Sequence, residues 1–400
     1  MDAFQKLPVE IVLSIVHHTA DFFGVYSLLQ VSPCMRSVFE ANHSRLLEDL
    51  LTTCPSTSYE LHQLVRIAVL IRTPSFKPLN FDEFALASHA SALTGLQSLS
   101  EASAYEMIKI AARIQHLACV CLSKMLQSFR DAQYDPVFPK LWETNGTDPF
   151  SWIEEFRVYR ILWRLQIRSD LQLAAAAQDK SGEDWGGWGW PSTEIQKLAT
   201  YFDMSHMQAQ QTHGVADILR ELGALFSHEQ EVLGPSLRDD MSPDFQYPMP
   251  LIESLQISTP DKKPIWCPPA LPEDTGVDKI WGRSTRSCRI SKQGVFYKAI
   301  QRDFPFQPGV YVTGLDDLRP FYRTGVFIWD NWRMYSLRLI SMKSGDDPRA
   351  PYGCNFELLL ETPDGAWVDP ALTGRGDLQK TWSALLQRSI GGSESIHRRI

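Results

Sequence analysis

Histidines and cysteines are the side chains most suited to metal binding or nucleophilic chemistry, but their spacing here points to neither. His17 and His18 are adjacent, so on a helix their side chains diverge by about 100° and do not converge on one metal ion. Cys119 and Cys121 are separated by a single residue, which matches neither a zinc-ligand nor a dithiol redox spacing. We therefore interpret the histidine pair as a solvated helix end and expect no metal and no cofactor.

Common enzyme signatures are also missing from the sequence. The chain contains no G-x-x-x-x-G-K-[ST], H-E-x-x-H or G-x-S-x-G motif, and "GGWGW" lacks the glycine spacing of a dinucleotide-binding turn. Catalytic residues can still be brought together from distant parts of a chain. The sequence therefore predicts a non-catalytic protein, with catalysis by scattered residues as the alternative.

Composition narrows the classes of partner. The chain has 400 residues, of which 44% are hydrophobic, and a net charge of −8, so two or three folded domains are expected. Lys and Arg form no long run or stripe, which argues against nucleic acid as a partner.

No stretch of about 18 apolar residues and no basic leader occur in the sequence. We therefore expect no membrane association and an intracellular location, in the cytoplasm or the nucleus. The seven scattered cysteines predict reduced, mostly buried thiols.

Helical periodicity dominates the first half of the chain. Three short helices are predicted in residues 1–45: one over 7–18 with Pro8 in its first position, one over 22–31 capped by Asp21, and one starting at Pro33 and capped by Ser32. Apolar residues at helical spacing predict further helices. These cover 60–72, 80–92, 101–130, 150–178, 192–203 and 205–230, with 150–178 as the central helix.

The remaining segments are less regular. "KSGEDWGGWGWPS" (180–192) is predicted to be a packed plug rather than an exposed binding tip, because solvent-exposed tryptophan is unfavourable. Residues 233–275 are rich in proline and predict an extended connector. A helix is expected after Pro320, with Ile328 and Trp332 among its apolar residues, and "CNFELLLETPDGAWVD" (354–369) suggests a short hairpin.

"LPVEIVLSIVHH" (7–18) has more apolar surface than a helix of one small core requires. On a helix its apolar residues cover an arc of roughly 200°, whereas a stripe of about 100° suffices to face a core. These residues are Val9, Ile11, Val12, Leu13, Ile15 and Val16. Either a partner covers the surplus, or the segment is an ordinary core helix of a larger helical domain.

The first 45 residues resemble the F-box family. Its pattern opens with Leu-Pro, followed by an acidic residue, an aliphatic residue and a second aliphatic residue four positions on. An apolar second helix follows, and the pattern closes with a valine, a small residue and an arginine. The matching residues are Leu7, Pro8, Glu10, Ile11, Ile15, Leu28, Val31, Ser32 and Arg36. Residues 154–171 and 321–330 are similar to segments of the F-box proteins of filamentous fungi. The chain departs from the pattern at His17-His18 and at Cys34-Met35, which implies a weaker adaptor affinity than usual.

The resemblance implies a function in protein ubiquitination. In this family the three-helix F-box docks on the C-terminal helices of a Skp-type adaptor, which binds a cullin scaffold, while the rest of the chain holds a protein substrate. Here the substrate is unknown, since no internal repeat of a recognised receptor module occurs. The adaptor-binding residues would be Leu7, Pro8, Ile11, Ile15, Leu28, Val31 and Met35. The expected protein is a non-catalytic substrate receptor of an SCF-type ubiquitin ligase. The alternative is a structural or regulatory adaptor-binding protein that does not direct ubiquitin transfer.

The expected fold is therefore mainly α. Residues 1–45 would form the three-helix F-box and residues 46–232 an irregular α-helical domain. A Pro-rich connector (233–275) would lead to a small mixed helical region (276–400) that packs on the helical domain.

Overall fold

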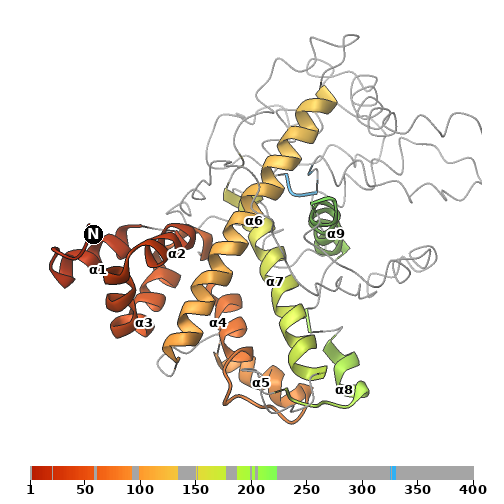
Figure 1. The fold of residues 1–400 in the computed structure, drawn as a ribbon. Coiled ribbons are helices and arrows are strands. Elements are labelled where there is room, and N and C mark those ends of the chain that lie inside the picture. The colour runs from red at the N-terminus through yellow and green to blue at the C-terminus, as the bar shows by residue number, and fades with distance from the viewer. Residues whose placement is uncertain are drawn as a thin grey trace, which may run out of the picture.

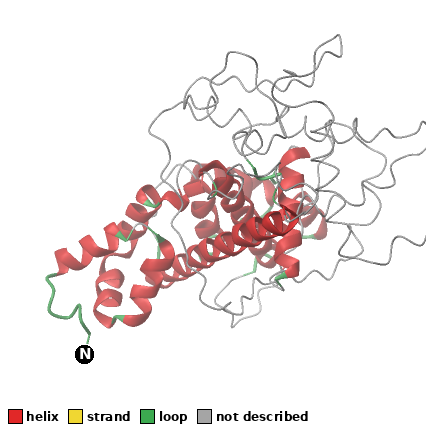
Figure 2. Cartoon of the chain, turned by 90° about the horizontal axis from the view of Figure 1, so that it is seen from above, coloured by secondary structure: helices red, strands yellow, loops and turns green. Residues whose placement is uncertain are grey.

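The computed structural model describes residues 2–19, 21–57, 61–91, 99–133, 150, 152–176, 187–198, 201–202, 206–222, 325 and 327–329. Within these ranges the chain is mainly helical and has no β-strand (Figure 2). The predicted mainly α class is confirmed for this part of the protein. The connector 233–275 and the hairpin 354–369 lie outside the described residues.

The N-terminal region forms three helices, and the second and third of them start at side-chain caps. These are α1 (Val9–His18), α2 (Phe22–Val31) and α3 (Pro33–Thr53). The Asp21 carboxylate accepts a hydrogen bond from Gly24 N at 2.6 Å, and Ser32 Oγ accepts one from Met35 N at 3.0 Å. Both predicted N-caps are confirmed. The sequence predicts Pro8 in the first helical position of α1. In the structure Pro8 is the N-cap residue, and the helix begins at Val9.

Helix α3 continues past residue 45, where the sequence predicts the end of the three-helix unit. Asn42 interrupts it with non-helical dihedral angles (φ −131°, ψ 15°), and its side-chain amide donates to Val38 O at 2.9 Å. A side chain that hydrogen-bonds to the carbonyl oxygen four residues earlier bends a helix without ending it. Beyond this kink, Leu46, Leu47 and Leu50 are buried, so both halves of α3 contribute to one core.

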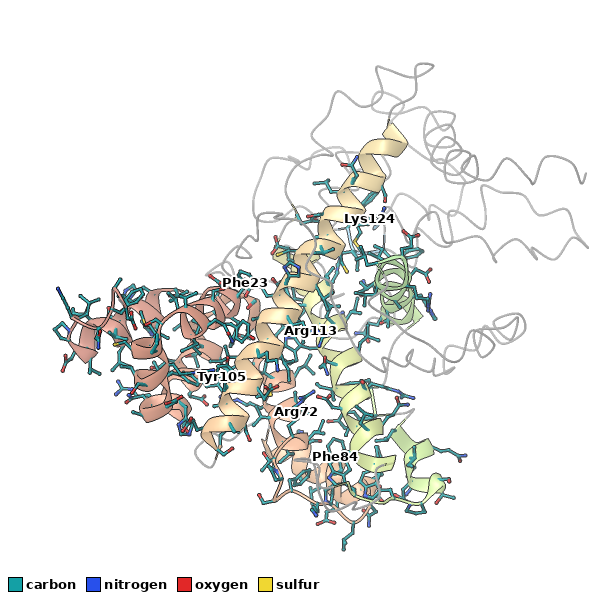
Figure 3. All side chains as sticks on the ribbon, viewed as in Figure 1. Phe23, Arg72, Phe84, Tyr105, Arg113 and Lys124 are labelled. Carbon is teal, nitrogen blue, oxygen red and sulfur yellow. The ribbon has the colours of Figure 1, made fainter. Side chains whose placement is uncertain are left out.

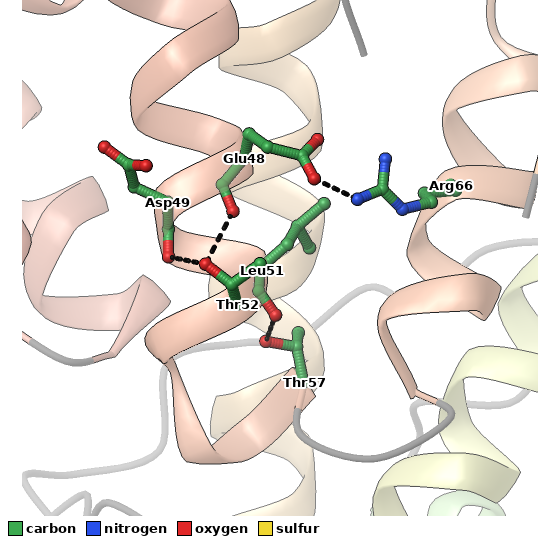
Figure 4. A network of polar contacts seen from close by, with 6 residues as sticks. All are labelled: Glu48, Asp49, Leu51, Thr52, Thr57 and Arg66. Carbon is green, nitrogen blue, oxygen red and sulfur yellow. Dashed lines mark hydrogen bonds and ion pairs between the residues drawn. The ribbon is translucent and has the colours of Figure 1, made fainter. Parts of the chain in front are cut away.

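The second half of α3 is tied to the next helix by polar contacts (Figure 4). A 3-10 turn (Pro55–Thr57) follows α3 and precedes α4 (Leu61–Ile71). Thr57 Oγ1 donates to Leu51 O at 3.1 Å, which closes this turn onto α3. The Arg66 guanidinium of α4 pairs with the Glu48 carboxylate of α3. These contacts fix α4 against the N-terminal helices.

The remaining helices form the body of the molecule around one long helix. They are α5 (Phe81–Ser91), α6 (Glu101–Gln133), α7 (Trp152–Ala176), α8 (Ser192–Lys197) and α9 (His206–Glu221). Helix α6 separates α1–α3 from α7 (Figure 1), and α2 packs along it. Each helix predicted for this region is present within the described residues, although α8 ends at Lys197 rather than at 203 and α9 ends at Glu221 rather than at 230. Helix α7 is buried along most of its length, as expected for a central helix.

A buried ion pair joins α4 to α7. Arg72 Nε and Nη2 donate to the two carboxylate oxygens of Asp170 at 2.8 and 2.6 Å, and Gln166 Nε2 donates to Asp170 Oδ1 at 2.9 Å. The Asp170 side chain is only 1% exposed. Burial raises the pKa of Asp170, and the neighbouring Arg72 opposes this shift.

The described part of the Trp/Gly segment, residues 187–192, packs as the predicted plug. The indole N–H groups of Trp188 and Trp190 donate to Phe76 O at 3.1 Å and to Pro78 O at 2.8 Å. Both rings pack against Phe84, with centroid distances of 5.7 and 6.4 Å. The plug therefore closes the end of α7 nearest to α5.

Residues 327–329 return from a distant part of the sequence into the core (blue in Figure 1). Their side chains are each 1% exposed. Arg157 Nη1 of α7 donates to the carbonyl oxygens of Ile328 and Trp329 at 2.7 and 2.6 Å, and Gln211 Nε2 of α9 donates to Phe327 O at 3.0 Å. Ile328, predicted on a helix, lies in a turn that Gly325 begins.

Replacing Gly325 by alanine is expected to destabilise the protein by about 1–3 kcal/mol. Gly325 has φ +77°, and an added Cβ would lie 3.1 Å from Met125 Cβ and Cγ. Gly189 is the matched control, because it also has a positive φ (+62°) but no atom within 4 Å of an added Cβ. Urea unfolding of both variants checks this. Equal losses of stability would show that the α6 contact contributes nothing.

The cysteines that the structure describes lie mostly in the core. Cys54, Cys119 and Cys121 are buried and Cys34 is half-buried, as predicted for these four residues. Burial raises the pKa of Cys121 to about 12, so this thiol is not a nucleophile at neutral pH. Among the helices that the structure describes, none combines the length and apolar character that a membrane span needs.

Candidate protein-docking surface

Helix α1 uses only the centre of its apolar arc to reach the core. Val12 and Val16 are 0% and 1% exposed, whereas Ile15 on one side of them and Leu13 on the other are half-buried. Ile11 remains 48% exposed. Because α1 packs on α3 at the edge of the molecule (Figure 1), the chain itself leaves part of this arc uncovered.

The exposed edge of α1 continues into the residues that precede it. Leu7 is 37% exposed and Pro8 is also exposed. Ile11 N donates to Pro8 O at 3.0 Å, so Leu7, Pro8, Ile11 and Ile15 follow one another at helical spacing along this edge. At the end of α2, Val31 is 72% exposed. We call Leu7, Pro8, Ile11 and Val31 the N-terminal apolar surface.

The predicted docking residues fall into three groups. Leu7, Pro8, Ile11 and Val31 are exposed, whereas Ile15 and Leu28 are half-buried. Met35 is 0% exposed and belongs to the core, so its prediction as a docking residue is corrected. Its position explains this: in α3 the buried residues Met35, Val38 and Phe39 recur at three- and four-residue spacing and face α1 and α2.

A side-chain network places the start of the chain next to the junction of α2 and α3. The Asp2 carboxylate accepts hydrogen bonds from Phe4 N at 2.9 Å, Ser32 Oγ at 2.8 Å and Cys34 N at 2.9 Å. The N–H donors of Cys34 and then of Phe4 hold the pKa of Asp2 below its usual value. Asp2 was not predicted as a functional residue, and no sequence pattern marks it.

The N-terminal helices are fixed to the body through α6. The Arg36 guanidinium lies 5.0 Å from the ring centroid of Tyr105, Gln30 donates to the Tyr105 hydroxyl, and Phe23 N donates to Gln115 Oε1 at 3.2 Å. Figure 3 shows Phe23 and Tyr105 on the two sides of this contact. These contacts join the helices that carry the N-terminal apolar surface to α6.

No metal site accompanies this surface. His17 and His18 are exposed at the end of α1, as predicted for a solvated helix end. Across the residues that the structure describes, no group of three His, Cys, Asp or Glu side chains is placed to hold a metal ion. The surface offers apolar contact area, and exposed apolar area of this kind is typical of protein interfaces.

Comparison with known proteins adds no relative. Neither the models of known protein families nor the curated proteins nor the solved structures contain a match to this chain.

Truncation to alanine should lower the free energy of unfolding at Val12 but hardly change it at the neighbouring Ile11. Val12→Ala is expected to lower the free energy of unfolding by about 1–3 kcal/mol, because the side chain is 0% exposed. Ile11→Ala should change it by less than about 0.5 kcal/mol, as for other surface substitutions. Urea unfolding measures both. A large loss for Ile11→Ala would show that the chain already buries this residue.

Proposed function

We propose that the chain is an F-box protein that binds a Skp-type adaptor through its N-terminal apolar surface and acts as the substrate receptor of an SCF-type ubiquitin ligase. The observation that carries this proposal is the exposure of Leu7 (37%), Ile11 (48%) and Val31 (72%), at the positions where the sequence resembles the F-box. Large apolar side chains grouped at one end of a folded protein indicate a protein interface.

The energetics favour a helical partner that covers the exposed edge of α1. Each Å² of apolar surface removed from water contributes about 25 cal/mol, and a stable interface buries roughly 1,600 Å² in total. The exposed residues alone are too few for such an area. An adaptor would therefore also contact Ile15 and Leu28, which are half-buried. Ile15 lies one helical turn after Ile11, and Leu28 lies one turn before Val31.

The body would hold the protein substrate. Binding one partner at the N-terminal apolar surface and another on the body raises the local concentration of the substrate near the conjugating enzyme. The contact between α2 and α6 supports this role, because it keeps the two parts in a fixed relative orientation. The bond chemistry is left to other subunits, and the complex would act in the cytoplasm or the nucleus without nucleic acid.

Purification of the tagged full-length chain from a filamentous fungus tests the proposal. We expect both the Skp-type adaptor and a cullin to co-purify in amounts comparable to the bait. Adaptor without cullin would replace the ligase by the alternative, a structural or regulatory protein that binds the adaptor alone. Absence of the adaptor would contradict the F-box assignment itself.

A further inference from the structure

We propose that Asp2 is a positioning residue for the N-terminal apolar surface: its carboxylate fixes the first residues of the chain to the start of α3 and thereby sets Leu7 and Pro8 near Val31. The inference rests on the proposed adaptor binding and adds a residue that lies outside the F-box pattern.

The hydrogen bonds of Asp2 connect two distant parts of the sequence. Oδ1 accepts from Phe4 N within the N-terminal segment, whereas Oδ2 accepts from Ser32 Oγ and Cys34 N at 2.8 and 2.9 Å. Ser32 directly follows Val31. One carboxylate therefore joins the segment that leads to α1 to the end of α2.

The start of α3 is well suited to this carboxylate. The first N–H groups of a helix have no partner within it and carry partial positive charge. Ser32 Oγ accepts from Met35 N at 3.0 Å, and Asp2 takes the N–H of the preceding residue, Cys34. Asp2 thus caps α3 from a separate segment, and its negative charge is favourable there.

The same network determines where Leu7 lies. Phe4 O accepts from Leu7 N at 3.0 Å and from the Cys34 thiol at 3.6 Å, so Leu7 and the start of α3 share an acceptor. Phe4 is half-buried against the core, but Ala3, Gln5 and Lys6 are exposed. Asp2 accepts two hydrogen bonds from the start of α3 and Phe4 O accepts one, so the Asp2 carboxylate is the main polar attachment of this segment.

Replacing Asp2 by alanine tests the inference in the full-length chain. We expect the affinity for the Skp-type adaptor, measured by calorimetry, to fall by about tenfold or more, as for other losses of hydrogen bonds to a charged group. Asp2→Asn should fall between Asp2→Ala and the unmodified chain, because its remaining oxygen can still accept from Ser32 and Cys34. Gln5→Ala is the control in the same segment and should bind like the unmodified chain.

The reactivity of Cys34 provides a readout that does not need the adaptor. Its thiol donates to Phe4 O, so release of the segment in Asp2→Ala should speed alkylation of Cys34 at least severalfold, while Gln5→Ala leaves the rate unchanged. Peptide mapping assigns the modified cysteine. The denaturation midpoint of Asp2→Ala should fall below that of Gln5→Ala, because the cap of α3 is lost with the carboxylate.

The outcomes separate this inference from the proposed function. Unchanged adaptor affinity in Asp2→Ala would overturn the positioning role while leaving the F-box assignment intact. Unchanged Cys34 reactivity would also overturn it, since the segment would then be held by other contacts. Failure of the unmodified chain to bind the adaptor would overturn the proposed function and this inference with it.

Discussion

Replacing Leu7 and Pro8 together by alanine is expected to abolish capture of the Skp-type adaptor while changing the free energy of unfolding by less than about 1 kcal/mol. Both residues are exposed, so their truncation removes little of the protein's own core. In the proposed complex they would be buried near the centre of the interface, where a few anchor residues carry most of the binding free energy. Calorimetric titration and urea unfolding of the same preparation measure the two effects.

Leu79→Ala is the matched control for this experiment. Leu79 is 81% exposed and precedes α5 in the sequence. Because α5 lies far from α1 (Figure 1), truncation of Leu79 should leave adaptor capture unchanged. Capture of the Leu7→Ala/Pro8→Ala variant at the level of this control would remove the docking proposal.

The largest effect on stability is expected for Arg72→Ala. This change leaves the Asp170 carboxylate, which is 1% exposed, without its ion-pair partner. Removal of one member of a buried pair costs about 3–5 kcal/mol at neutral pH. Arg45→Ala is the control, because it breaks an ion pair at the surface. The Arg45 side chain is 83% exposed, and its Nε lies 3.9 Å from Asp49 Oδ2. Surface pairs contribute about 1 kcal/mol or less, so equal destabilisation of the two variants in urea would contradict the structural role of Arg72.

The cost of Arg72→Ala should depend on pH in a defined direction. Burial raises the pKa of Asp170 above 3.8, and Arg72 counteracts this, so the variant raises that pKa further. A carboxyl group whose pKa is raised in the folded state holds its proton more tightly there than in the unfolded chain. The folded state therefore loses stability as the pH increases from 3.8 through the folded-state pKa. The difference between the variant and the unmodified chain should therefore be smallest at acid pH and grow toward neutral pH. A difference independent of pH would assign the loss to packing.

Local sequence rules account for much of the fold. Asp21 and Ser32 were recognised as N-caps from their residue types and the apolar residues that follow, and both contacts are present. Trp188 and Trp190 were predicted as packed because their large rings need burial. These features depend on neighbours within a few residues, which a single sequence shows directly.

Features that depend on tertiary contacts were not predictable in this way. Periodicity gives the width of the apolar arc of α1 but not which part faces the core, so it did not separate Val12 (0% exposed) from Ile11 (48%). Met35 is predicted as a docking residue, although α3 turns it into the core. Asp2 contacts residues about 30 positions away, and nothing in its local sequence indicates this.

Side-chain footprinting with hydroxyl radicals, on the free full-length chain and on its mixture with the Skp-type adaptor, tests the central claim most directly. We predict that Leu7, Ile11 and Val31 react in the free chain and become protected in the mixture, whereas Val12 stays unreactive in both. Reactivity of Leu7 and Ile11 that does not change on addition of the adaptor would contradict the account, and so would a free chain in which these two residues are already protected.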